Sequence, residues 1–329
     1  MSKLYPVGVQ NFEKVILGGY EYVDKTALTY QLFNTGSYYF LSRPRRFGKS
    51  LLLSTLEAYA QGKKELFKGL ALEKLEKDWT VYPVLHLDLN TQKYDTPESL
   101  TSILNDNLCI WESQYGARES ETSLSLRFQG IIRRACEQTG RRVVILIDEY
   151  DKPMLQAIGN ETLQNEYRST LKAFYGALKS MDGCIRFALL TGVTKFGKVS
   201  VFSDLNNLRD ISMIDQYAEI CGISEKEIYT YFEEDIHELA AATDMSYKEA
   251  CAELKTNYDG YHFTENAIGM YNPFSLLNTF ANRRFGSYWF ETGTPTYLVE
   301  LLKLHHYPIE DLEHIVTSQP VLDSIDTAS

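Results

Sequence analysis

The sequence predicts a three-layer α/β fold with a mainly parallel sheet, followed by a smaller and mostly helical domain. Short strands of almost continuous apolar residues alternate with helical segments from Tyr38 to about Ile214. Strands this uniformly apolar are typical of a parallel sheet that helices cover on both faces. The 23 Tyr and 16 Phe residues supply large apolar areas for a substantial core. After about Asp215 helices and loops replace this alternation, so we divide the chain into a core of residues 1–215 and a helical, lid-like or winged-helix-like domain of residues 216–329.

The elements of the first domain follow from apolar runs and from one-sided helical periodicity. The predicted strands are Tyr38–Ser42, Pro83–Asn90, Val143–Ile147 and Ile185–Leu190. The predicted helices are Leu51–Gly62, Pro97–Glu112, Thr122–Thr139 and Thr162–Ser180.

Helix-start signals support the second domain. Ser224–Glu227 and Ser246–Glu249 both fit the capping box, in which a hydroxyl residue precedes a glutamate by three positions. Asn272-Pro273 and Thr294-Pro295 look like two further helix starts, because proline suits the first helical turn.

The composition limits the classes of function. The net charge of −11 argues against a broad grip on DNA or RNA, so we do not expect direct nucleic-acid binding by this chain. Five scattered cysteines without a CxxC pair, and six histidines without ligand spacing, indicate neither a disulfide framework nor a zinc site. The chain has no apolar run of signal-peptide or membrane-span character, so we expect a cytoplasmic protein.

The stretch "RPRRFGKS" between the first strand and the first helix predicts a phosphate-binding loop. In such a loop, backbone N–H groups surround phosphates at a helix N-terminus, where the helix dipole also favours negative charge. Lys49 would place a positive charge near the β- and γ-phosphates, and Ser50 would bind Mg²⁺. The strand–loop–helix setting is the one that this Walker A motif requires.

The loop lacks the glycine that normally opens such motifs. Arg43 stands there, and its Cβ makes a left-handed backbone costly. Pro44 removes one N–H group. The guanidinium groups of Arg43, Arg45 and Arg46 have two alternatives, which are to face phosphates or to pin the loop to carboxylates elsewhere. We favour the second for at least two of the three.

The strand Val143–Ile147 ends in Asp148 and Glu149, the pattern of a Walker B segment. Asp148 would hold Mg²⁺, usually through water, and Glu149 would polarise the attacking water as a general base. This pair favours the ATPase division of P-loop proteins that has an extra strand between the two motifs. We expect the strand Pro83–Asn90, alone or with a neighbour, to supply the intervening strand.

Several other polar residues have two possible roles each, one functional and one structural. Thr191, with Thr194 as its alternative, would sense the γ-phosphate or the lytic water, or would be a turn threonine. Asp151 and Lys152 would orient Glu149 or act as an interface switch, or would form an exposed turn.

Two further sets of residues stay open. "YVDK" (Tyr22–Lys25) would line the base of a nucleotide or belong to the core. Several cations are candidates for a trans-acting, sensing or lid role, with surface charge as the alternative for the last two: Lys195, Lys198, Arg209, Arg283 and Arg284.

Seven phrases together closely resemble the AAA-ATPase-like domain family of bacterial proteins. They are "YVDKTALTYQLF", "FLSRPRRFGKSLLLSTLEAY", "ILIDEYDKP", "LLTGVTKFGKVSVFSDLNNLRDIS", "YDGYHF", "YNPFSLLN" and "YWFETGTPTYLVELL". The resemblance runs from about Tyr5 to Leu302 and implies an AAA-like P-loop fold that takes ATP with Mg²⁺. In this family RPRRFGKS is the usual form of the loop. Members often carry a C-terminal PD-(D/E)XK nuclease-like domain, but the tail of this chain shows no such arrangement.

The expected function is a Mg-ATP-binding ATPase module whose slow hydrolysis serves as a regulatory switch. The expected catalytic residues are Glu149, Lys49 and Thr191, and the expected metal ligands are Ser50 and Asp148. The expected nucleotide-binding residues are Arg45, Arg46, Phe47, Gly48, Lys49, Ser50, Leu51 and Asp148. Two alternatives are a non-hydrolysing nucleotide-binding or protein-interaction scaffold and the ATPase part of a DNA-processing or defence nuclease system. A nuclease-like domain, a partner protein or a second copy of the chain would be the partner.

Overall fold

The computed structural model describes residues 3–195, 201–202, 205, 207–264 and 268–289. The chain divides into two compact units, which we call the loop unit and the sheet unit. The described part of the loop unit is 3–36, 43–81 and 210–289, and that of the sheet unit is 37–42 and 82–209, with the gaps given above. The boundary that we place near residue 215 stays a prediction.

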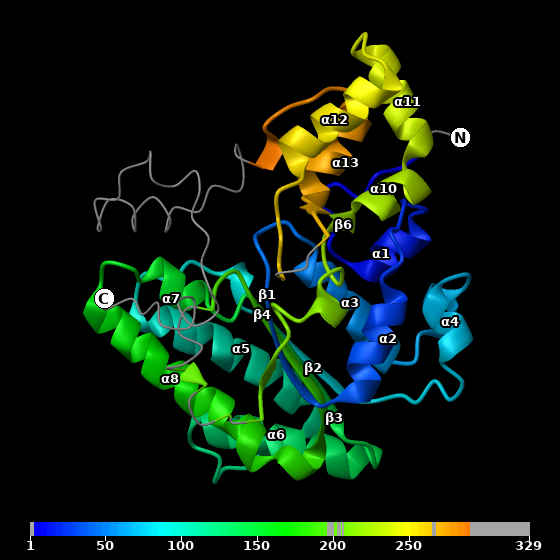
Figure 1. The fold of residues 1–329 in the computed structure, drawn as a ribbon. Coiled ribbons are helices and arrows are strands. Elements are labelled where there is room, and N and C mark those ends of the chain that lie inside the picture. The colour runs from blue at the N-terminus through cyan, green and yellow to red at the C-terminus, as the bar shows by residue number, and fades with distance from the viewer. Residues whose placement is uncertain (1–2, 196–200, 203–204, 206, 265–267, 290–329) are drawn as a thin grey trace. The chain divides into compact units, whose positions relative to one another are not determined.

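A mainly parallel five-stranded sheet confirms the predicted α/β class (Figure 1). Its strand order is β2-β3-β4-β1-β5. The strands are β1 (Tyr38–Ser42), β2 (Val84–Asp88), β3 (Val143–Asp148), β4 (Ile185–Gly192) and β5 (Arg209–Asp210). The pairs β1/β4, β4/β3 and β3/β2 are all parallel.

One sequence-based expectation about strand order is wrong. The strand that lies between β1 and β3 is β4, whereas β2, which we expected there, lies at the edge of the sheet beside β3. Parallel strands are joined by long crossover connections, so a later strand can insert between two earlier ones. Order along the chain therefore does not determine order in the sheet.

Three helices of the sheet unit agree with the predicted segments to within three residues at each end: α5 (Pro97–Tyr115), α6 (Leu124–Thr139) and α8 (Glu161–Ser180). The short helix α7 (Lys152–Gln156) and the 3-10 turns η2 (Leu89–Thr91) and η3 (Asp182–Cys184) were not predicted. Aromatic residues join α5, α6 and α8. The Phe128 and Phe174 rings stack with centroids 4.4 Å apart, and Trp111 stacks on Phe128 at 5.7 Å. These contacts bury the apolar faces that the helical periodicity predicted.

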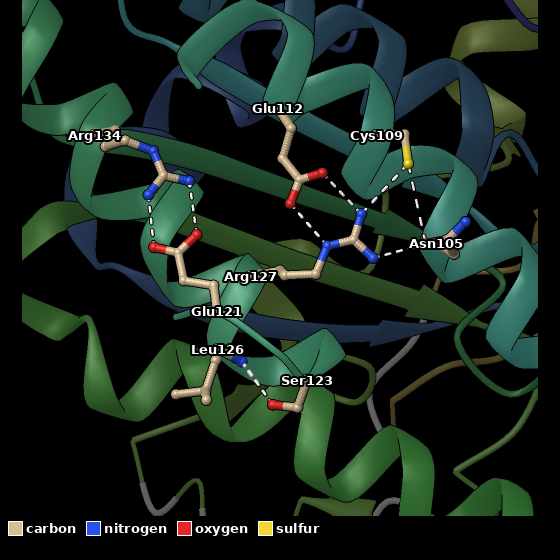
Figure 2. Close-up of polar contacts among 8 residues, drawn as sticks. All are labelled: Asn105, Cys109, Glu112, Glu121, Ser123, Leu126, Arg127 and Arg134. Atoms are coloured by element: carbon tan, nitrogen blue, oxygen red, sulfur yellow. Dashed lines mark hydrogen bonds and ion pairs between the residues drawn. The ribbon is translucent and has the colours of Figure 1, made fainter. Parts of the chain in front are cut away.

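Two arginines of α6 hold its N-terminal connection and α5 in place (Figure 2). Arg134 donates from both terminal nitrogens to Glu121, at 2.6 and 3.0 Å, and both side chains are about nine-tenths buried. Arg127 forms a second two-pronged pair with Glu112, at 2.7 and 2.8 Å, which lowers the pKa of that carboxyl group. Ser123 caps α6 by accepting a hydrogen bond from the backbone of its first turn.

The loop unit is mostly helical. Its elements are α1 (Phe12–Leu17), α2 (Thr26–Thr35), α3 (Lys49–Ala60), η1 (Lys64–Phe67), α4 (Ala71–Leu75), η4 (Asp215–Tyr217), β6 (Ile223–Ser224), α10 (Glu225–Tyr231), α11 (Glu233–Ala242), α12 (Tyr247–Tyr258), β7 (Met270–Tyr271) and α13 (Pro273–Asn282). Both predicted capping boxes are present, at Ser224 and Ser246, and Asn272 caps α13 as predicted. The predicted helix start at Thr294-Pro295 lies outside the described residues.

The chain's thiols and helices agree with the sequence on two further points. All five cysteines are free thiols. Within the described ranges, no helix is both long enough and apolar enough to cross a membrane.

Candidate functional site

The connection from β1 to α3 passes through a left-handed glycine directly before the helix. β1 ends at Ser42, and α3 begins at Lys49 with Gly48 as its N-terminal cap. Gly48 has φ 94° and ψ 16°, in the left-handed region that glycine adopts without the penalty of a Cβ. A Cβ at this position would contact nothing within 4 Å, so the backbone angle, not crowding, calls for glycine. The loop thus delivers the chain to the N-terminus of a 12-residue helix, whose first N–H groups have no partner inside the helix.

The Lys49 side chain folds back onto the loop. It is only 3% exposed, and its ammonium donates to the carbonyl oxygens of Arg43 at 3.0 Å and Pro44 at 3.3 Å. The loop therefore holds a positive charge at the start of α3.

Arg43 anchors the loop from behind. The side chain is 1% exposed and donates to the carbonyl oxygens of Ser212 at 2.7 Å and Tyr217 at 3.2 Å. The guanidinium carbon also lies 3.9 Å from the centroid of the Phe263 ring. Burial lowers the pKa of Arg43 to about 10, while the charges of Cys221 and Asp210 oppose this shift. The guanidinium thus pins the loop through two main-chain carbonyl oxygens, and its pairing with a carboxylate stays a prediction.

Besides Gly48, the loop has one left-handed residue, and it is not Arg43, where we argued that such a backbone would be costly. Arg43 is absent from the residues with positive φ, whereas Arg46 has φ 64°. The exposed Arg46 side chain lies over the Phe274 ring of α13, 3.9 Å from its centroid. The Arg45 carbonyl accepts a hydrogen bond from the Trp289 indole at 3.1 Å. Residues from the C-terminal half of the chain therefore contact the loop at all three of its arginines, Arg43, Arg45 and Arg46.

An apolar cavity of about 90 Å³ adjoins the loop in the same unit. Of the predicted nucleotide-binding residues, Phe47, Gly48 and Leu51 line it. Tyr22 and Lys25 of the "YVDK" segment line it as well, and Tyr22 also packs on Phe12 with ring centroids 5.2 Å apart. The remaining lining is mainly apolar and comes from α2, α3, β6 and α13: Thr29, Leu52, Thr55, Ile220, Cys221, Gly222, Ile223, Phe232, Pro273 and Leu277, with Pro6, Glu21 and Val23.

In the sheet unit, Asp148 lies at the carboxyl end of β3 with its side chain 2% exposed. Its Oδ1 accepts a hydrogen bond from the Thr191 hydroxyl at 2.6 Å and one from the Glu149 backbone N–H at 3.0 Å. Strand register explains this meeting, because Thr191 is the penultimate residue of β4, which lies directly beside β3, and it pairs on its other side with Leu41 of β1. Leu41 is thus the register partner of Thr191, and the loop that leads to α3 begins two residues later, at Arg43.

Glu149 and its neighbours form a tight turn. Glu149 has φ 53°, an uncommon backbone for a non-glycine residue, and its side chain is half-buried. The Tyr150 N–H donates to the Thr191 carbonyl at 2.9 Å. Gly192 makes room for this turn, since a Cβ there would lie 2.5 Å from the Tyr150 ring.

Asp151 is not part of an exposed turn, so that alternative is wrong. The residue is fully buried and accepts hydrogen bonds from the Val193 and Thr194 backbones at 3.1 and 2.8 Å and from the Thr194 hydroxyl at 2.8 Å. It therefore fixes the segment that follows β4. Thr194 is engaged here, and Thr191 is the threonine that contacts Asp148.

The structure adds Asp88, which the sequence analysis did not single out. Asp88 ends β2 and pairs in register with Asp148 of β3. Burial raises the pKa of Asp88, and the charges of Asp148 and Glu149 add to this effect. The available signal was a carboxylate near the carboxyl end of the predicted strand Pro83–Asn90.

Two other predicted cations contact residues outside these clusters. Lys152 donates to the Asn90 side chain at 2.7 Å, and Arg283 pairs with Glu238 at 2.7 Å on the surface. Lys198 lies outside the described residues. Roles for Lys195, Arg209 and Arg284 stay predictions. Over the described part of the chain, no three His, Cys, Asp or Glu side chains group together as metal ligands.

The fold and the loop together define a class. An α/β P-loop protein has a parallel sheet and a strand–loop–helix whose loop runs into the helix through Gly-Lys-Ser. It also has an acidic strand end that one strand separates from the strand before the loop, as β4 separates β3 from β1 here. Residues 6–202 match the family model described as a predicted AAA-ATPase, and the chain belongs to this AAA-ATPase-like family. This membership supports nucleotide binding in general.

A curated relative extends the comparison over nearly all of the chain. It is described as an uncharacterized protein in the vnfD 5′ region of Azotobacter chroococcum mcd 1, and it is 39% identical over 326 residues. The match covers 98% of this chain but only 61% of the relative. The association with a nuclease-like domain and the formation of a homo-oligomer stay predictions.

Proposed function

We propose that this chain is a Mg-ATP-binding ATPase module that hydrolyses ATP slowly and uses its nucleotide state as a regulatory switch. The observation that carries the proposal is the loop geometry. A buried Lys49 ammonium is tied to the loop's own carbonyls, next to a left-handed Gly48 at the N-terminus of α3. Backbone N–H groups, helix dipole and ammonium all favour phosphate oxygens in such a loop.

The apolar cavity beside the loop suits a nucleobase. Its Phe47, Leu51 and Tyr22 walls offer apolar and aromatic surface, while Lys25 is tied to Glu227 at 2.5 Å. Flat aromatic bases gain most from such surfaces. We therefore assign the base of ATP to this cavity, which agrees with the adenine-side alternative for "YVDK".

Ser50 and Asp148 are the proposed Mg²⁺ ligands. The two hydrogen bonds to the Asp148 carboxylate both end on Oδ1, so Oδ2 is the oxygen that we assign to the metal or to its bound water. Ser50 stands in the first turn of α3, next to Lys49. These two residues would hold Mg²⁺, whose positive charge would offset the negative charge of the phosphates.

Glu149 is the proposed general base. Uncommon backbone conformations persist where surrounding structure enforces them, and they concentrate at functional sites. Here the turn of Tyr150 onto Thr191 and the burial of Asp151 enforce the left-handed Glu149. Thr191 is the proposed sensor, because its hydroxyl donates a hydrogen bond to the Asp148 carboxylate.

The bracing of the loop explains how a switch would work. A nucleotide that shifts the loop must shift the contacts of Arg43 with Ser212, Arg46 with Phe274 and Arg45 with Trp289. All three partners belong to the C-terminal half of the chain. The helical region would in this way report the state of the phosphate loop.

The test measures ATP affinity by calorimetry and phosphate release with Mg-ATP. We expect Lys49→Ala to weaken ATP binding by at least about tenfold, because a charged phosphate contact is lost. Glu149→Gln should keep ATP affinity but slow phosphate release by about 10²-fold or more, if release by the wild type exceeds background. Glu166→Gln, an exposed change on α8, serves as the matched control for charge.

Two results would separate the alternatives. Equal, background-level release by wild type and Glu149→Gln, with ATP still bound, would reject hydrolysis and support a non-hydrolysing nucleotide-binding module. Pro44 motivates this alternative, since it removes one N–H group from the loop. No binding of ATP or ADP at millimolar concentration would reject the proposal and leave a protein-interaction scaffold.

A further inference from the structure

Three of the seven phrases quoted above contain none of the residues that we assign to phosphate, Mg²⁺ or catalysis: "YDGYHF", "YNPFSLLN" and the start of "YWFETGTPTYLVELL". In the structure these phrases converge on one pocket of about 620 Å³ within the loop unit. The pocket lies at the C-terminal end of α12 and the start of α13. Its lining is Glu253, Asn257, Tyr258, Asp259, Gly260, Tyr261, Asn272, Ser275, Phe285, Gly286, Ser287 and Trp289.

The lining combines negative charge with aromatic rings. Among the lining residues that the structure describes, Glu253 and Asp259 are the charged ones, and none of these residues is a lysine or an arginine. Glu253 accepts from the Asn257 amide at 2.9 Å, and Asp259 accepts from the Gly260 N–H at 2.7 Å, so both carboxylates are held in place by neutral donors. The aromatic walls are Tyr258, Tyr261, Phe285 and Trp289. Aromatic faces beside carboxylates attract organic cations.

Asn272 supplies an independent sign of a ligand. It is 2% exposed, and its Oδ1 caps α13 by accepting from the Ser275 N–H at 3.0 Å. Its Nδ2 is buried and has no acceptor among the residues that the structure describes. A buried donor without an acceptor destabilises the folded protein. Asn272 is also one of the residues that line the pocket.

We propose that this pocket binds an arginine-type ligand, that is, a guanidinium group with a carbonyl close by. The guanidinium would stack on the aromatic walls and pair with Glu253 and Asp259, and the carbonyl would accept from the Asn272 amide. A planar guanidinium fits this setting better than an ammonium, because it both stacks on rings and forks onto carboxylates. Free arginine and an arginine in a peptide share this chemistry.

The pocket also touches the phosphate loop through two of its walls. The Trp289 indole donates to the Arg45 carbonyl at 3.1 Å, and the Tyr261 ring packs on Phe47 with centroids 4.7 Å apart. A ligand that changes the position of either wall therefore changes the loop. We infer that pocket occupancy and nucleotide affinity are coupled, a step that rests on the proposed function. Such coupling is reciprocal, so nucleotide would change ligand affinity by the same factor.

The first experiment tests the pocket alone, by calorimetry on the full chain without nucleotide. The probe is Nα-acetyl-L-arginine amide, and the matched control is the citrulline analogue, which has nearly the same shape without the charge. We expect the Glu253→Gln, Asp259→Asn double variant to weaken probe binding by at least about tenfold, because charge-assisted contacts are lost. Glu234→Gln, an exposed change on α11, should leave probe affinity unchanged.

Free L-arginine and an arginine-containing tripeptide, titrated in parallel, distinguish the two sources of the ligand. The proposal is overturned if the citrulline analogue binds as well as the arginine probe, or if the double variant binds normally. It is also overturned if the probe does not bind at about 10 mM, well above the range of specific binding. Thermal unfolding midpoints of the variants confirm that each remains folded.

The second experiment tests the coupling. ATP affinity is measured with and without saturating probe in the wild type and in Trp289→Phe, which keeps an aromatic wall but removes the indole donor. We expect a change of about fivefold or more in the wild type and a clearly smaller one in the variant, with probe affinity retained. Equal ATP affinities with and without probe in the wild type overturn the coupling. Probe binding by a chain that never binds ATP rejects the proposed function but leaves the pocket assignment intact.

Discussion

The phosphate loop and the carboxyl end of β3 both contain a buried charge at a tight turn, but they are held by different means. In the loop unit, the Arg43 guanidinium donates to main-chain carbonyls 169 and 174 positions away and lies over an aromatic ring. In the sheet unit, the Asp148 carboxylate accepts from its own chain neighbour and from Thr191, 43 positions away on the adjacent strand.

The difference follows from what each turn must do. Strand register alone brings Thr191 to Asp148, so the acidic turn is as rigid as the sheet. The loop has no such register and relies on long-range packing by Phe263, Phe274 and Trp289. A turn held by register suits fixed chemistry, whereas a loop held by a separate helical region can transmit a change.

The largest expected effect comes from removing the loop's anchor. Arg43→Met should lower the free energy of unfolding by about 2–4 kcal/mol, because the Ser212 and Tyr217 carbonyls lose a charged donor. Urea titration gives the overall change, and hydrogen exchange should place the loss in the loop unit. Arg46→Met is the matched control, since Arg46 is exposed, and it should cost less than about 0.5 kcal/mol. Equal costs for the two variants would contradict the assigned role of Arg43.

The second effect tests the acidic turn. Thr191→Val keeps the side-chain shape but removes the donor to Asp148, and it should cost about 1.5–3 kcal/mol, the usual range for a hydrogen bond to a charged group. Hydrogen exchange should increase in β3 and β4 and not in the loop unit. Thr191→Ser keeps the hydroxyl and should lose clearly less stability. If protection from hydrogen exchange fell equally in both units, the acidic turn would not be held by the sheet alone, which would contradict this prediction.

A smaller effect should follow from weakening the aromatic bracing of the loop. Phe47→Leu retains an apolar side chain but removes the ring contacts with Tyr261 and Phe263, at 4.7 and 5.4 Å. We expect a loss of about 1 kcal/mol, typical of an aromatic pair and a modest change in packing. ATP affinity should fall with it if the bracing sets the loop's shape. Unchanged stability and affinity would show that Arg43 alone supports the loop.

The smallest effect concerns Asp88, whose pKa is raised by burial. The folded protein binds this proton more tightly than the unfolded chain, so folding stability falls as pH rises above the ordinary range of a carboxyl group. Asp88→Asn, which stays neutral, should therefore be slightly more stable than the wild type at about pH 7. This advantage should vanish at about pH 4 or below, where both states hold the proton. Urea midpoints of both proteins at the two pH values provide the check, and an advantage independent of pH would contradict it.

The strands and helices were predictable because local patterns determine them. The apolar runs of β1, β3 and β4 and the hydroxyl–glutamate pairs at Ser224 and Ser246 leave little choice of local structure. The order of the strands was not predictable in the same way. Nothing local in β2 says that it lies at the edge of the sheet, because long crossovers allow several orders.

In the candidate site, too, the features that depend on neighbouring residues were predictable and those that depend on distant residues were not. The Gly-Lys-Ser at the start of α3 and the Asp-Glu at the end of β3 were visible as motifs, since their chemistry depends on adjacent residues. The role of Arg43 and the contribution of Asp88 were not, because each depends on residues distant in sequence.

The amino-acid sequence by itself determined the class of fold, the family and the residue types that could handle phosphate. Those properties rest on backbone preferences and on neighbouring side chains, which any reader of the chain can see. Tertiary structure decided that Arg43 faces inward, that Thr191 meets Asp148, and that three phrases of the sequence line one pocket. These outcomes depend on which distant segments become neighbours, and only packing of the whole unit settles that.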